Sequence, residues 1–170
     1  KNLAPLLKAA KALGFYTLVN TNATVAGKKL LRYAAPYIDN VLVSLQGRDN
    51  KTESEATRIQ GLFPEKLANI NSLKAGGVKV LRLGTVISND VLSNFPAYYR
   101  LAGKLKADIW ELYRPMPEKT APGGKNGFHL KPEDIKRLSK HIASLKTVQP
   151  RVVIANPVPL CLAQAGERKH

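Results

Sequence analysis

The sequence is poor in cysteine, tryptophan and acidic residues. Its 170 residues include one cysteine, Cys161, and one tryptophan, and 27 Lys and Arg stand against 12 Asp and Glu. A single cysteine excludes an internal disulfide, and alone it holds neither zinc nor an iron–sulfur cluster. The sequence also lacks an apolar signal segment and any apolar run of about 18 residues or more, so we expect a soluble cytoplasmic protein without a membrane partner.

The shortage of acidic residues leaves a formal net charge of +15, which favours an anionic partner. The basic residues are scattered along predicted helices and form no compact run with interleaved aromatic residues, as a nucleic-acid-binding face would. We therefore expect a solvated basic surface and keep a nucleic-acid-binding module as an alternative. The basic residues in question are Lys8, Lys11, Lys28, Lys29, Lys66, Lys74, Lys104, Lys106, Lys131, Lys136, Arg137 and Lys140.

The usual catalytic signatures are also missing. There is no glycine-rich phosphate loop, no G-x-S-x-G elbow and no H-E-x-x-H zinc motif. The three histidines, His129, His141 and His170, have a spacing that suggests no metal site. Any chemistry would therefore have to come from a cofactor.

Helical and β-prone segments alternate along the chain. Amphipathic spacing predicts helices over 3–13, about 26–35, 65–75, about 94–106 and from Pro132, and strands are predicted over 15–19, 41–45, 78–87, 108–113 and 151–155. The alternation predicts an α/β protein with a parallel sheet, either doubly wound or an arc of a β/α barrel. Five strands are too few to close a barrel, and the chain opens on a helix with no strand before it. We therefore expect a partial parallel β/α (TIM-like) barrel, incomplete in this chain, with βα units missing at the front.

Hydrogen-bonding side chains follow each predicted strand. They are Asn20, Thr21 and Asn22; Ser44 and Gln46; Ser88 and Asn89; Arg114; and Asn156. Ligands of parallel α/β sheets bind beyond the carboxyl ends of the strands, so this set suits a polar small ligand. Each could instead cap a strand or a turn. Within the strands, Arg82 could face inward or pair with a carboxylate, and Glu111 needs a cationic partner such as Arg82 or Arg114.

The strand ends, taken in order, resemble those of radical S-adenosylmethionine enzymes. The segment 14–24 (GFYTLVNTNAT) is similar to their third strand, 41–47 (VLVSLQG) to their fourth, and 77–89 to their fifth with its "t-v-i-x-x-N" ending. The segment 59–67 resembles the loop into the next helix, and 110–117 (WELYRPMP) the sixth strand. The resemblance covers residues 3–118, and rests on the order and spacing of these pieces.

The resemblance implies an enzyme that binds S-adenosylmethionine at a 4Fe–4S cluster and generates a 5′-deoxyadenosyl radical for hydrogen abstraction. The cluster would be held by a C-x-x-x-C-x-x-C loop, which this sequence lacks, so its ligands are expected outside this chain. By position, the resemblance assigns cofactor binding to Thr21, Asn22, Ser44, Gln46, Tyr113 and Arg114, substrate binding to Asn20 and Arg82, and a cluster-ligand role to Cys161. Ala23 stands where the family has glycine, and Gln46 where it has aspartate.

The resemblance divides the chain into residues 1–147, the C-terminal portion of the barrel, and 148–170, a final strand with the start of a C-terminal extension. The implied partners are a small-molecule or peptide substrate and an electron donor, and this chain alone would be inactive. An unrelated β/α-barrel enzyme that binds a phosphorylated substrate through Arg82 and Arg114 is a further alternative.

Overall fold

The computed structural model describes residues 3–24, 33–115, 130–145 and 149–156. The strands are β1 (Leu18–Thr21), β2 (Asn40–Ser44), β3 (Val80–Val86), β4 (Ile109–Tyr113) and β5 (Arg151–Ile154). The helices are α1 (Leu3–Ala12), α3 (Asn50–Thr57), α4 (Leu62–Ala75), α5 (Asn89–Ser93), α6 (Phe95–Lys104) and α7 (Pro132–Ala143), with a short 3-10 turn, η1 (Ala35–Tyr37). No helix in these described ranges is long and apolar enough to cross a membrane.

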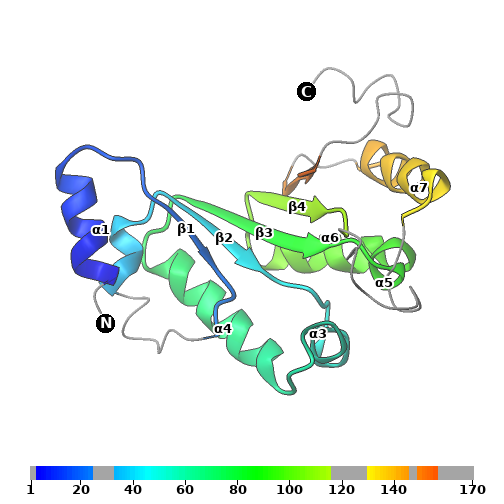
Figure 1. The fold of residues 1–170 in the computed structure, drawn as a ribbon, viewed down its shortest axis with the longest axis horizontal. Helices are drawn as coiled ribbons and strands as arrows, with labels where there is room; N and C mark the ends of the chain where they lie inside the picture. Colours follow the sequence, from blue (N-terminus) through cyan, green and yellow to red (C-terminus); the bar gives the residue numbers. More distant parts are fainter. Residues whose placement is uncertain (1–2, 25–32, 116–129, 146–148, 157–170) are drawn as a thin grey trace, which may run out of the picture.

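The five strands form one parallel sheet in the order β1-β2-β3-β4-β5 (Figure 1). Strand order in a doubly wound sheet reverses at a switch point, whereas strands of a β/α barrel follow one another around it. The sequential order therefore selects the barrel arc over the doubly wound alternative. It confirms the predicted fold class, part of a parallel β/α barrel.

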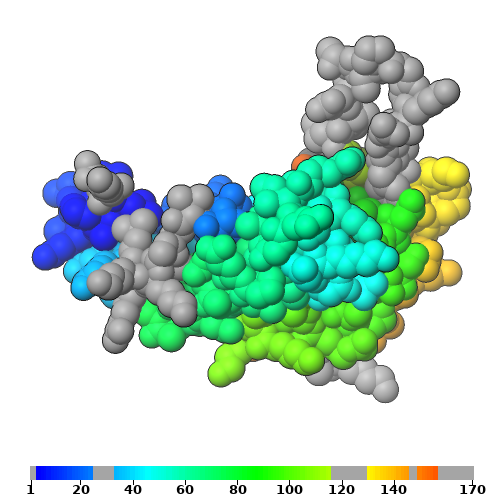
Figure 2. Space-filling view, turned by 90° about the horizontal axis from the view of Figure 1, so that it is seen from below, coloured from blue at the N-terminus to red at the C-terminus, as the bar shows by residue number. Residues whose placement is uncertain are grey.

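The core lies between one face of the sheet and the helices. Residues that alternate along β2, β3 and β4 are buried toward the helices: Val41, Val43, Leu81, Leu83, Trp110 and Leu112. Against them pack Ile70 and Leu73 of α4 and Phe95, Tyr98 and Ala102 of α6, as their helical spacing predicted. Figure 2 shows this side of the molecule, where α4 and α6 hide most of the sheet. The opposite, concave face of the sheet carries the alternate residues.

Several elements differ from prediction, among them the short helix α5, which lies ahead of the helix predicted from about residue 94. The first strand begins at Leu18 rather than at residue 15, and Phe15 and Tyr16 are exposed. The polar segment after β2 contains a helix, α3, that apolar periodicity does not reveal. Most of the predicted helix 26–35 lies outside the described residues.

Asp39 secures the amino-terminal end of the sheet. Its side chain is 4% exposed and pairs with Lys11 of α1 at 2.8 Å and with Lys79 at 2.9 Å, and it accepts a hydrogen bond from the Thr17 backbone at 2.9 Å. Lys11, the Thr17 amide and Lys79 hold the pKa of the Asp39 carboxyl well below its usual range. This one carboxylate therefore joins α1, β1 and the start of β3.

Candidate functional site

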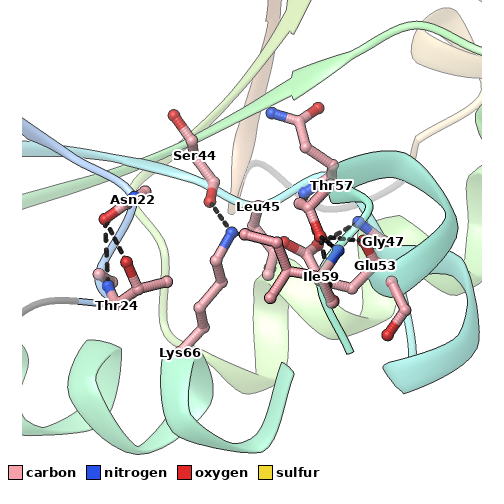
Figure 3. A network of polar contacts seen from close by, with 12 residues as sticks. Asn22, Thr24, Ser44, Leu45, Gly47, Glu53, Thr57, Ile59 and Lys66 are labelled. Carbon is pink, nitrogen blue, oxygen red and sulfur yellow. Dashed lines mark hydrogen bonds and ion pairs between the residues drawn. The ribbon is translucent and has the colours of Figure 1, made fainter. Parts of the chain in front are cut away.

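The carboxyl end of β2 presents Ser44 to the concave face. Val41 and Val43 point into the helical core, so Ser44, one residue further, lies half-buried on the other face. Its carbonyl accepts a hydrogen bond from Lys66 at 3.1 Å. Figure 3 shows the Ser44 hydroxyl on the side of β2 away from Lys66, and it makes no hydrogen bond to another residue in the described part of the chain. The backbone of Ser44 is thus fixed while its hydroxyl is open to a ligand.

The loop after Ser44 is held from below by a buried ion pair. Lys66 of α4 and Glu53 of α3 are paired, with side chains 2% and 0% exposed. The second carboxylate oxygen of Glu53 accepts from the backbone amides of Gln46 at 2.8 Å and Gly47 at 2.6 Å. A Cβ at Gly47 would overlap the backbone of Glu53, so α3 can approach the loop only because this position is glycine. Lys66 was expected on the solvated basic surface; that prediction is wrong, because its partner lies in the unpredicted helix.

Two side chains continue the β2–β3 ladder past its end. The Gln46 side-chain oxygen accepts from the Val86 amide at 2.8 Å, and the Thr85 hydroxyl donates to the Leu45 carbonyl at 2.7 Å. Thr85 in turn accepts from the indole nitrogen of Trp110 at 2.9 Å. Glutamine at position 46 therefore has a structural role here, with its amide nitrogen left over for a ligand.

A second tie fixes the same loop to the next βα unit. Arg48 pairs with Asp90 of α5 at 3.3 Å, and the hydroxyl of Tyr98 donates to Asp90 at 2.8 Å. The Asp90 carboxylate raises the pKa of the Arg48 guanidinium, and burial, followed by Asp90, raises the pKa of Tyr98. Tyr98 also reaches the Gln46 carbonyl, at 3.3 Å. The loop is therefore preorganised on two sides.

At the end of β1 the polar side chains act on their own backbone. Thr21 accepts from the Ala23 amide at 3.0 Å, and Asn22 accepts from the amide and hydroxyl of Thr24 at 3.2 and 2.8 Å, which is turn chemistry. Ala23 is fully buried with φ of 58°, a conformation that favours glycine, and this explains the glycine usual at this position. Asn20, exposed on the concave face, makes no side-chain hydrogen bond within the described ranges.

The concave face of β3 and β4 carries a chain of three polar side chains. Arg82 pairs with Glu111 at 3.3 Å, and the Tyr113 hydroxyl donates to the other oxygen of Glu111 at 2.6 Å. Burial, followed by Glu111, raises the pKa of Tyr113. Gly84 lies beneath, since a Cβ there would stand 3.2 Å from the Tyr113 ring and from Leu42. Of the two partners expected for Glu111, Arg82 and Arg114, the structure pairs it with Arg82. The Nε of Arg82 is buried and has no hydrogen-bond partner among the described residues.

Several remaining strand-end residues hold local structure. Asn156 accepts from the Arg114 amide at 2.8 Å and so ties the end of β5 to that of β4. Ser88 caps α5 by accepting from the Val91 amide at 3.3 Å. The guanidinium Nε of Arg114 is buried and unpartnered. Among the described residues, side-chain groups without a hydrogen-bond partner on the concave face or at this edge of the sheet therefore remain on Ser44, Asn20, Gln46, Arg82 and Arg114.

Comparisons with known proteins agree with this geometry. No family model matches the chain. The "AdoMet-dependent heme synthase" of Oleidesulfovibrio alaskensis is 23% identical over 117 residues, which cover 68% of this chain and 30% of that protein. Streptococcus suis SuiB, solved with S-adenosylmethionine, superposes with a TM-score of 0.61 at 21% identity over 82% of this chain and 30% of its own. The structure of anSMEcpe with S-adenosylmethionine (AdoMet) and the Kp18Cys peptide gives 0.59 at 16% identity, over 74% and 35% of the two chains.

The chain shares its fold with these two proteins that were solved with S-adenosylmethionine. The resemblance seen in the order of strand ends is thereby confirmed. The chain spans about a third of the length of the relatives it matches.

S-adenosylmethionine and an iron–sulfur cluster, the two groups that the sequence resemblance implies, fit this chain unequally. A free hydroxyl on a rigid strand end, Ser44, suits the polar groups of S-adenosylmethionine. An iron–sulfur cluster does not fit, because the sequence has one cysteine and the described residues contain no group of three or more His, Cys, Asp or Glu placed to hold a metal. Cys161 lies outside the described residues, so its predicted ligand role stays a prediction, as does the division at residue 148.

Proposed function

We propose that this chain forms part of the S-adenosylmethionine site of a radical enzyme, with Ser44 as its principal contact. The observation that carries the proposal is that the backbone of Ser44 is held while its side chain is free. Lys66 donates to the Ser44 carbonyl at 3.1 Å, and the Ser44 hydroxyl faces the concave side of the sheet. Preorganised donors and acceptors bind a polar ligand without ordering cost. The bound cofactor seen in SuiB and in anSMEcpe, which share the fold, supports the proposal.

The other predicted contacts follow from what each side chain has left to offer. Gln46 retains its amide nitrogen after its oxygen is used by Val86. Thr21 and Asn22 hold the β1 turn and would meet the cofactor through the backbone that they shape. Tyr113 and Arg114, at the end of β4, would pack beside the adenine, a flat ring that aromatic and guanidinium planes stack against.

S-adenosylmethionine held by Ser44 beside a reduced 4Fe–4S cluster would supply a 5′-deoxyadenosyl radical for hydrogen abstraction from a substrate. The cluster ligands would come from outside this chain, and reduction requires an electron donor. In this proposal the strand-end residues of this chain bind and orient the cofactor and shield the substrate from solvent. The chain alone is inactive.

Asn20 and Arg82 would contact the substrate on the concave face. Because Glu111 balances the charge of Arg82 at 3.3 Å, a phosphorylated substrate would have to compete with that carboxylate. The pair instead suits a polar substrate that hydrogen-bonds to the remaining guanidinium N–H groups. Both a small molecule and a peptide satisfy this, and relatives act on or bind each kind: one is named a heme synthase and one holds a peptide.

The test replaces Ser44 with alanine in the complete, cluster-loaded protein and measures S-adenosylmethionine binding by calorimetry. Loss of one hydrogen bond of about 0.5–1.5 kcal/mol weakens binding roughly 2- to 12-fold. Ser72→Ala is the matched control, because Ser72 bonds only to the Ala68 carbonyl, on the exposed surface of α4. An unchanged dissociation constant for Ser44→Ala in a folded protein would refute the assignment.

A further inference from the structure

The buried face of α4 carries two polar side chains where apolar ones would be expected. Lys66 is 2% exposed and Asn69 is 3% exposed, and they lie three residues apart on one side of the helix. Their neighbours on that face, Ile70 and Leu73, are core residues. Burying an amine or amide costs free energy unless its hydrogen bonds are satisfied. The hydrogen-bond partners of Lys66 and Asn69 therefore indicate the role of these buried side chains.

Lys66 and Asn69 each donate a hydrogen bond to a backbone carbonyl where a strand ends. Lys66 donates to the Ser44 carbonyl at the end of β2, at 3.1 Å. Asn69 donates to the Ala23 carbonyl just after β1, at 2.7 Å. One helix turn therefore holds two neighbouring strand ends, at the edge of the sheet where Thr21, Asn22 and Ser44 lie.

The hydrogen bonds from Lys66 and Asn69 lie where the backbone conformation needs support from another segment. Ala23 has φ of 58°, which costs a residue with a Cβ about 1–2 kcal/mol. Past Ser44 the β2 backbone turns, and the amides of Gln46 and Gly47 point to Glu53, the ion-pair partner of Lys66. Replacing a buried ion pair by apolar residues is often neutral or stabilising. Stability alone therefore does not account for this charged arrangement, whereas directed bonds to Ser44, Gln46 and Gly47 do.

We propose that Lys66 and Asn69 are positioning residues that set the direction of the β1 and β2 ends, so that the Ser44 hydroxyl and the Thr21–Asn22 turn face one ligand. Lys66 acts with Glu53 on residues 44–47, and Asn69 acts on Ala23. Neither side chain touches the ligand. The inference rests on the proposed function for its ligand, and on the contacts above for its mechanism.

The test compares three variants of the complete protein. Glu53→Gln combined with Lys66→Met removes both buried charges together, so no unpaired ion is left inside. Asn69→Ala removes only the bond to Ala23. The matched control is Lys74→Met, which breaks the ion pair of Lys74 with Asp108 (2.8 Å) at the other end of the same helix. Amide hydrogen exchange without ligand and S-adenosylmethionine binding by calorimetry are measured for each.

We expect the double variant to speed exchange at Gln46 and Gly47, Asn69→Ala to speed it at residues 23–24, and each to weaken binding roughly ten-fold, since a bond is lost at each site. Lys74→Met should change neither quantity. Unchanged binding by folded variants of a protein that binds the cofactor would overturn the proposal. If the parent protein does not bind S-adenosylmethionine, the proposed function fails, and exchange still decides the positioning role: unchanged rates overturn it. Should the double variant not fold, Asn69→Ala supplies the same decision.

Discussion

Of the two variants Thr85→Val and Thr85→Ser, we expect the more hydrophobic one, Thr85→Val, to be the less stable. The Thr85 side chain is 2% exposed; its hydroxyl donates to the Leu45 carbonyl at 2.7 Å and accepts from Trp110 at 2.9 Å. Valine keeps the shape and leaves two buried polar groups without partners, at about 1–3 kcal/mol each. Serine keeps both bonds and removes one methyl group, which costs about 1 kcal/mol.

We therefore expect Thr85→Val to lose about 1–5 kcal/mol of unfolding free energy after the gain from burying its extra methyl, with a central value of about 3 kcal/mol, and Thr85→Ser to lose about 1 kcal/mol. Urea denaturation followed by circular dichroism measures both, and the fluorescence of the only tryptophan, Trp110, reports the same transition from beside the mutation. In a Trp110→Phe background the valine substitution should cost less, because one of its two orphaned groups is gone. Equal stability of the two variants, or a more stable valine variant, would refute the reasoning.

Two further predictions concern the ends of the sheet. The partners of Asp39 depress the pKa of its carboxyl in the folded state, so the stabilisation by Asp39 is complete above the unfolded-state pKa of about 3.9 and is lost as pH falls through the folded-state pKa. Asp39→Asn should therefore lower the urea midpoint at pH 7 and flatten the dependence of stability on pH in the acid range. An unchanged dependence on pH would contradict this. Gly47→Ala should destabilise by about 3 kcal/mol or more, because its Cβ meets the backbone of Glu53 rather than a movable side chain. Its control, Gly103→Ala inside α6, has no such neighbour and should stabilise by about 0.5–1 kcal/mol; similar urea midpoints for the two would show that the overlap is relieved freely.

The sequence predicted the strands and their parallel pairing well, because β2, β3 and β4 are buried and apolar. It predicted α3 badly, since that helix buries Glu53 rather than an apolar stripe. The available signal was the capping pair of Asp49 and Thr52, in which each side chain bonds the other's backbone amide. Missing α3 made Lys66 appear solvated, because the carboxylate that balances its buried charge, Glu53, lies on α3.

In the candidate site, too, some features could be predicted from the sequence and others could not. The position of Ser44 near a strand end follows from the apolar run Val41-Leu42-Val43 before it, which the sequence displays. Which strand-end residues are free for a ligand does not follow, because it depends on contacts between distant segments: Gln46 with Val86, Asn156 with Arg114, and Asn69 with Ala23. Such pairs have no sequence period, and only the fold brings them together.

The grip on Ser44 has a consequence for how this site can diversify. Lys66 holds the main chain of position 44, and every amino acid supplies that carbonyl. The side chain at 44 is thus relieved of any part in keeping the strand in place, and threonine, asparagine or cysteine could be installed there without loosening the loop. A protein built this way can exchange the functional group that it offers to a ligand while the frame that aims it stays unaltered, which makes position 44 the natural starting point for altering ligand preference by design.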